Sequence, residues 1–156
     1  NSGFRIKELL ANEQTFSLSQ REDAKVNLVI AGIVGTLVMT MVMVLAPKMS
    51  MPEMDIVGML TNKFGKGNKA VGWMMHLVMG IVFVFIYSYS GFFDSYLNAA
   101  ILGVVHWLVV GFMMGIMPGM DGGFYMTKNG GVMAFMGGLI GHVIFALAAF
   151  YTAGLF

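Results

Sequence analysis

The chain has 156 residues, of which 58% are hydrophobic and only 11% are charged, and its formal net charge is +1. Soluble domains are nearer half apolar and a quarter charged, so this composition excludes an ordinary soluble protein. The nearly balanced charge gives no footprint for a nucleic-acid partner. The absence of cysteine excludes disulfides, thiolate metal sites and thiol nucleophiles.

Residues 1–25 form a polar tail ahead of the first apolar stretch. Ser2 is placed to cap a short amphipathic helix, which would lie at the membrane interface or against a partner chain. We expect this helix to lie against a partner chain. The sequence Ser19-Gln20-Arg21-Glu22 has the form of a capping box, which predicts that the first transmembrane helix begins there.

Four long stretches of the remaining chain carry no Lys, Arg, Asp or Glu, and each can cross ~30 Å of hydrocarbon as a helix. A helix satisfies its own backbone polar groups, as lipid requires. The predicted fold class is therefore all-α: a polytopic membrane protein whose residues 26–156 form a four-helix bundle with both termini on one side. The helices are expected over residues 26–47, 69–90, 97–117 and 131–154. A short surface helix is expected within the first loop, between Met54 and Phe64.

The four predicted helices also show an internal repeat. The first and third align without a gap when Gly32 is placed on Gly103, and both then end in a Pro-x-Met turn. The second and fourth align when Gly80 is placed on Gly141. This pattern predicts two tandem helical hairpins, duplicated and related by a pseudo-twofold axis along the membrane normal.

Small residues recur at a spacing of four on three of these helices. Because lipid tails are as apolar as leucine, membrane helices associate through close packing and polar contacts, and small residues permit both. We expect these stripes to face the bundle interior. They comprise Gly32, Thr36 and Thr40 on the first helix, Gly111 and Gly115 on the third, and Gly137 and Gly141 on the fourth.

All three histidines, His76, His106 and His142, lie within predicted transmembrane helices, where an ionisable residue is by default a functional hypothesis. With a rise of ~1.5 Å per residue, His106 and His142 lie at the same depth near the midplane. Flanking glycines predict that His76 and His142 face inward. We interpret His106 and His142 as candidate cofactor ligands for haem b, whose flat macrocycle suits small neighbours, or for copper. A purely structural role and a proton path remain alternatives.

The loops add candidate metal ligands. Met54, Met117 and Met120 complete the candidate copper set together with His76 of the second predicted helix, since thioether sulfur favours Cu(I). Two aspartates each follow a Pro-x-Met sequence and are candidate oxygen ligands at a mouth shared by both loops. Their alternative is a turn or a helix cap, and methionine within helices is commonly flexible apolar packing. The two aspartates are Asp55 and Asp121.

Several local motifs resemble an uncharacterised family of small four-helix prokaryotic integral-membrane proteins, a domain of unknown function. The motifs are Gly35-Thr36-x-x-Met39-Thr40, Pro47-Lys48-Met49, His106-Trp107-Leu108 and Met117-Pro118-Gly119-Met120. The resemblance covers about residues 30–155 and leaves out the tail. It implies a four-helix fold and a multi-pass location in the cytoplasmic membrane of a prokaryote, with no activity to carry over.

The chain carries no Ser-His-Asp order, phosphate loop or pair of intramembrane carboxylates, so we do not expect an enzyme on its own. The expected role is an accessory or structural subunit of a larger membrane complex, such as a respiratory or copper-monooxygenase-type oxidoreductase. Its partners would be lipid and other membrane subunits. The alternative is a small haem- or copper-binding membrane protein in electron transfer or metal handling. Proton or solute transport is a third hypothesis.

Overall fold

The computed structural model describes the backbone of residues 2–120 and 122–155, and the side chains of these residues from Phe16 onward except Asn129. The described chain is all α, and four of its helices are long and apolar enough to cross a membrane. The predicted fold class is therefore confirmed. The elements in order are α1 (Ser2–Leu45), the 3₁₀ turn η1 (Ala46–Met49), α2 (Ile56–Phe64), α3 (Lys69–Tyr89), α4 (Tyr96–Ile116), the 3₁₀ turn η2 (Phe124–Met126) and α5 (Thr127–Ala153).

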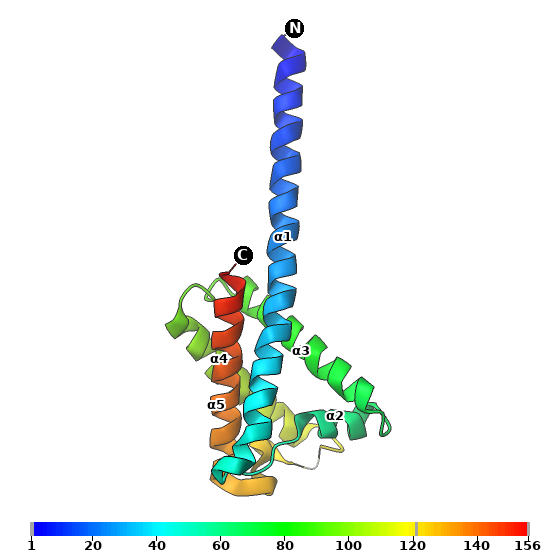
Figure 1. The fold of residues 1–156 in the computed structure, drawn as a ribbon, viewed down its shortest axis with the longest axis vertical. Coiled ribbons are helices and arrows are strands. Elements are labelled where there is room, and N and C mark those ends of the chain that lie inside the picture. Colours follow the sequence, from blue (N-terminus) through cyan, green and yellow to red (C-terminus); the bar gives the residue numbers. More distant parts are fainter. Residues whose placement is uncertain (1, 121, 156) are drawn as a thin grey trace.

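The four long helices form two hairpins that meet through α1 and α5 (Figure 1). Helix α1 packs against α3 and α5, and α5 also packs against α4. The backbones of α3 and α4 scarcely approach each other, although these helices are consecutive in the chain. The bundle ends of α1 and α5 that carry the termini lie on one side, and α2, η1 and η2 lie on the other. We call these the terminus end and the loop end.

Helix α1 differs from the prediction because it is continuous from Ser2 to Leu45. The motif Ser19-x-x-Glu22 therefore does not begin a helix, and Glu22 instead pairs with Lys25 at 3.2 Å on the helix surface. No glycine or proline interrupts residues 4–31, and the tail is rich in good helix formers, so nothing creates an end to cap. Residues 16–26 are exposed, and this part of α1 stands out beyond the bundle (Figure 1). The predicted Ser2 cap and amphipathic face lie among side chains outside the described set.

The other helices begin and end close to the predicted positions. The side chains of Asp55, Asn68 and Ser95 cap α2, α3 and α4 by accepting bonds from backbone N–H groups. Helix α5 begins earlier than residue 131, because a short turn joins it across a kink. At this kink Gly131 has a φ of 57°, a conformation that glycine adopts without strain.

Within each hairpin, the two helices cross closely at equivalent positions of the predicted repeat. A Cβ atom on Gly32 of α1 would lie 2.6 Å from the Cα of Ile81 in α3. A Cβ atom on Gly103 of α4 would lie 2.7 Å from the carbonyl oxygen of His142 in α5. Ile81 and His142 are themselves matched by the alignment of the second and fourth helices. A tandem duplication predicts this equivalence.

The small-residue stripes face inward as expected, but on α4 and α5 they receive loop side chains as well as neighbouring helices. Glycines provide the flat surfaces on which these larger side chains lie. The loop before α2 and the turn η2 are thereby held against the bundle. The contacts pair Gly130 with Pro52, Gly137 with Met54, Gly111 with Tyr125 and Gly115 with Phe124.

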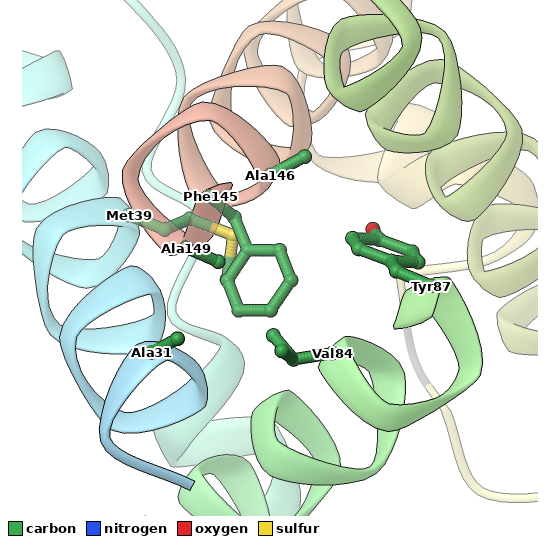
Figure 2. Packing of buried hydrophobic residues seen from close by; sticks show 7 residues of the cluster. All are labelled: Ala31, Met39, Val84, Tyr87, Phe145, Ala146 and Ala149. Carbon is green, nitrogen blue, oxygen red and sulfur yellow. The ribbon is translucent and has the colours of Figure 1, made fainter. Parts of the chain in front are cut away.

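Two clusters of buried apolar side chains divide the bundle interior. The cluster towards the terminus end is closely packed around Phe145, which is 1% exposed (Figure 2). It consists of Ala31, Met39, Val84, Tyr87, Phe145, Ala146 and Ala149. The cluster towards the loop end consists of Met54, Trp107, Val110, Met114, Met126 and Ala134.

Candidate functional site

A cavity of about 60 Å³ lies inside the bundle. This volume holds a few water molecules or a small ion, and it is far below the ~300–1,000 Å³ of a pocket for a drug-sized ligand. The cavity collects every histidine of the chain and a set of thioether side chains. Its donor-bearing lining residues are His76, His106, His142, Met39, Met43, Met54, Met79, Met114 and Met126.

The cavity exists because α3 and α4 stand apart, and large rings from both helices span the space between them. The ring of Phe83 in α3 stacks on that of His106 in α4, with ring centroids 3.5 Å apart and planes 24° apart. The ring of His106 also meets that of His142 in α5 edge to face, with 4.6 Å between the centroids. The prediction that His106 and His142 share one level is therefore confirmed.

His76 is buried on α3 and is held by a polar chain from α1. Its Nε2 atom lies 3.0 Å from Oγ1 of Thr40, and that hydroxyl donates to the carbonyl oxygen of Thr36 at 2.7 Å. A threonine hydroxyl has one proton, so Thr40 accepts from His76 Nε2–H. The neutral imidazole then keeps its lone pair on Nδ1. This ring faces inward, as its flanking glycines predicted.

His142 is held by its own helix. Its Nδ1 atom lies 2.8 Å from the carbonyl oxygen of Gly138, and a carbonyl can only accept, so Nδ1 carries the proton. The lone pair of the neutral ring is therefore on Nε2. An imidazole whose N–H is bonded to a backbone carbonyl has the orientation and tautomer typical of a metal ligand.

His106 is fixed by a short hydrogen bond between its Nδ1 atom and the hydroxyl of Tyr87, with 2.6 Å between the atoms. Tyr87 belongs to the cluster shown in Figure 2, where its ring projects from α3 towards the bundle interior. The Nε2 atom of His106 has no hydrogen-bond partner among the described residues. The sequence pattern around His106 did not reveal its direction, and the structure shows that it faces inward.

Trp107 is a cavity residue that our sequence analysis did not single out as a candidate. Its indole ring lies over Gly138 and faces the ring of His142, with centroids 4.9 Å apart. The side chain is 1% exposed, and its Nε1–H has no acceptor among the described residues. A buried donor without an acceptor is costly and points to an occupant with a lone pair, such as water. The available signal was Gly138, which lies one turn before His142.

The backbone of η2 places Met126 in the cavity. Tyr125 and Met126 both adopt left-handed conformations, with φ of 52° and 56°. Each such conformation costs about 1–3 kcal/mol for a residue other than glycine, and such residues gather at functional sites. The loop is also anchored by Lys63 of α2, whose ammonium group donates to the carbonyl oxygen of Pro118. Met126 is 3% exposed and packs among the loop-end cluster.

The other predicted loop ligands have mixed positions. Met54 lines the cavity, but Asp55 does not. Asp55 caps α2 instead, accepting from the N–H of Gly58 at 2.7 Å, which is the alternative that the sequence allowed. Met117 ends α4 and Met120 lies in the following turn, and neither lines the cavity. Asp121 lies outside the described residues.

The residues present do not fit haem. The rings of His106 and His142 are in direct contact, and the cavity has no space for a macrocycle between them. Among the described residues, no group of three His, Asp or Glu side chains is spaced for a metal ion, which argues against a zinc-type site. The donor set of imidazole nitrogen and thioether sulfur instead suits Cu(I).

Comparisons of the chain with protein-family models, curated proteins and solved structures find no match. The resemblance carried by the Gly-Thr and His-Trp-Leu motifs therefore stays an expectation.

Proposed function

We propose that this chain is a multi-pass membrane protein that binds one Cu(I) ion in the central cavity and serves metal handling or electron transfer. One observation carries the proposal. Three imidazoles and six methionines line a single small cavity, and the hydrogen bonds of His76 and His142 leave one ring nitrogen of each available as a ligand. The methionine sulfurs supply the remaining donors, because the three imidazoles, all within the described residues, are not spaced to bind one ion together.

The charge of the cavity supports a monovalent ion. No Asp or Glu is among its described lining residues, so nothing there would neutralise a bound cation. Burying an uncompensated charge in an apolar interior is costly, and the cost rises with the charge. Thioether and imidazole are both neutral ligands, and the soft thioether sulfur favours Cu(I) over a divalent ion at the same site.

The direct test is an anaerobic titration of the purified chain with Cu(I) held by a coloured competing chelator. We expect one equivalent of Cu(I) to be withdrawn from the chelator, and X-ray absorption to show nitrogen and sulfur neighbours. No Soret band is expected after incubation with haem. A chain that withdraws no Cu(I) from a weak chelator would overturn the proposal.

A matched pair of methionines on α3 tests the role of sulfur. Met79 lines the cavity, whereas Met74 is 56% exposed on the outer surface of the same helix. Met79→Leu keeps the volume and removes the sulfur, and we expect it to weaken Cu(I) binding by about 10-fold, roughly 1.4 kcal/mol. Met74→Leu should leave the affinity unchanged. Equal affinities for the two variants would remove Met79 from the ligand set.

Thr40→Val tests whether the α1 contact positions His76. The substitution keeps the branched shape but leaves Nε2 of His76 without its acceptor. Loss of such a supporting bond costs about 10–100-fold in metal affinity. We expect a loss in this range while one equivalent still binds at high Cu(I). Thr152→Val is the control, because its hydroxyl bonds the Ala148 carbonyl outside the cavity. An unchanged affinity in Thr40→Val would show that the bond has no role in binding.

A second proposal, favoured by α1, is that the chain is a subunit of a larger membrane complex, such as an oxidoreductase. The exposed part of α1 beyond the bundle buries nothing within this chain, and a partner chain would cover it. Deleting residues 1–25 should release co-purifying membrane subunits while Cu(I) binding persists. Retention of all partners after the deletion would count against this role.

A further inference from the structure

Two surface hollows at the loop end adjoin the central cavity. One, of about 290 Å³, lies between the end of α1 and the loop before α2, and it shares Met43, Met54 and Ile56 with the cavity lining. The other, of about 300 Å³, lies along α2 and shares Met126 with the cavity. Methionine side chains therefore separate the cavity from the surface on this side, and methionine is unbranched and adaptable.

Both hollows are lined by the same two carboxylates, Glu53 and Asp55, and both residues are exposed. No Lys or Arg is among the described residues that line either hollow. The nearby ammonium group of Lys63 is directed to the Pro118 carbonyl. The described linings of the hollows therefore carry two carboxylates and no basic side chain next to Met54, which itself is 5% exposed.

Tightly packed side chains lie at the terminus end of the cavity. Phe145 lines the cavity and is also the centre of the packed cluster in Figure 2, in which Val84 and Ala149 are fully buried. Tyr87 is 3% exposed, and its ring also contacts that of Phe93. The hollow at the terminus end, next to Phe93, shares no lining residue with the cavity.

We infer that Cu(I) enters and leaves the cavity at the loop end only, past Met54, and that Glu53 and Asp55 attract the cation to this entrance. The inference rests on the proposed function, because it concerns loading of the same site. It makes the chain a one-sided metal carrier and excludes a channel through the bundle. Met54 has the chemistry to pass the ion inward, since its thioether binds Cu(I) and the residue lines both the hollow with the carboxylates and the cavity.

The carboxylates are tested by the rate of loading. Glu53→Gln and Asp55→Asn remove charge at nearly constant shape, and asparagine still caps α2. In nanodiscs at low salt, the double variant should take up Cu(I) about 3–10-fold more slowly, because charged clefts raise on-rates by ~10–1,000-fold. The difference should disappear at high salt, where exposed charges are screened. Asp94→Asn at the terminus end is the control. Equal rates for wild type and double variant at low salt would overturn the steering role.

Sidedness is tested with wild-type protein in sealed vesicles, so that no variant has to fold. A membrane-impermeant Cu(I) chelator outside should strip metal only from molecules whose loop end faces outward. An N-terminal tag removed by an impermeant protease counts the molecules whose terminus end faces outward. We expect the stripped and cleaved fractions to add up to the whole. Stripping of the cleaved molecules would overturn one-sided access. Failure to load any Cu(I) beforehand would instead overturn the proposed function.

Discussion

Replacing His142 by alanine should abolish tight binding of Cu(I), with an affinity loss of at least ~100-fold, or about 2.7 kcal/mol. The hydrogen bond from Nδ1 of His142 to the Gly138 carbonyl leaves Nε2 with a free lone pair. The ring of His142 also contacts that of His106. Alanine removes one of the imidazoles that line the cavity and leaves mainly thioether sulfurs, which bind Cu(I) more weakly, in its place. Competition with a coloured Cu(I) chelator measures the loss.

The same variant distinguishes a metal site from a structural histidine. A ligand present at 100 times its Kd stabilises the folded state by about 2.7 kcal/mol, so Cu(I) should raise the thermal unfolding temperature of the wild type. Cu(I) should not raise the unfolding temperature of His142→Ala, whatever the unfolding temperature of this variant without metal. Met133→Ala, at a position 49% exposed on the same helix, should keep it. A histidine needed only for packing would lower both unfolding temperatures equally and leave the increment intact.

Much of the fold could be predicted because membrane helices are encoded locally. The length of an uncharged run and the cost of unsatisfied backbone groups in lipid are sufficient to place α3 and α4. Glycines near His76 and His142 also predicted their inward direction, since small residues mark the faces where helices meet. The predicted start of the first transmembrane helix was wrong because the Ser19-x-x-Glu22 motif shows only that these residues could cap a helix N-terminus, and does not require a helix to begin there. No glycine or proline forces an end there.

The cavity itself could not be predicted from local pattern. Its methionines come from helices and loops, and Met126 reaches it only through two left-handed residues in η2 that no sequence rule requires. The Pro-x-Met turns suggested a site shared by both loops, but the turns serve different ends. Met54 packs inward over Gly137, whereas Met120, the methionine of the second Pro-x-Met sequence, lies in the turn after α4 and does not line the cavity.

Substituting alanine at either crossing glycine should destabilise the bundle. A Cβ on Gly32 or Gly103 would lie closer than 3.0 Å to backbone atoms of the facing helix, so the helices must separate. Overpacking of this kind costs about 1–3 kcal/mol. Gly154→Ala is the control: its φ is −86° and its nearest neighbours are 3.7 Å from the added atom. Thermal unfolding in detergent should show similar losses for Gly32→Ala and Gly103→Ala, and none for Gly154→Ala.

The Cu(I) affinities of Gly32→Ala and Gly103→Ala should differ, although we expect the two variants to lose similar thermal stability. The helix that faces Gly103 carries His142 at the crossing, so Gly103→Ala should displace this proposed ligand along with the backbone. Gly32 faces Ile81, which bears no donor atom, so Gly32→Ala should retain more of the affinity. Equal affinities in these variants would mean that His142 is not held at the metal by this contact. Unequal stabilities would count against equivalent crossings, and with them against the duplication of one ancestral hairpin.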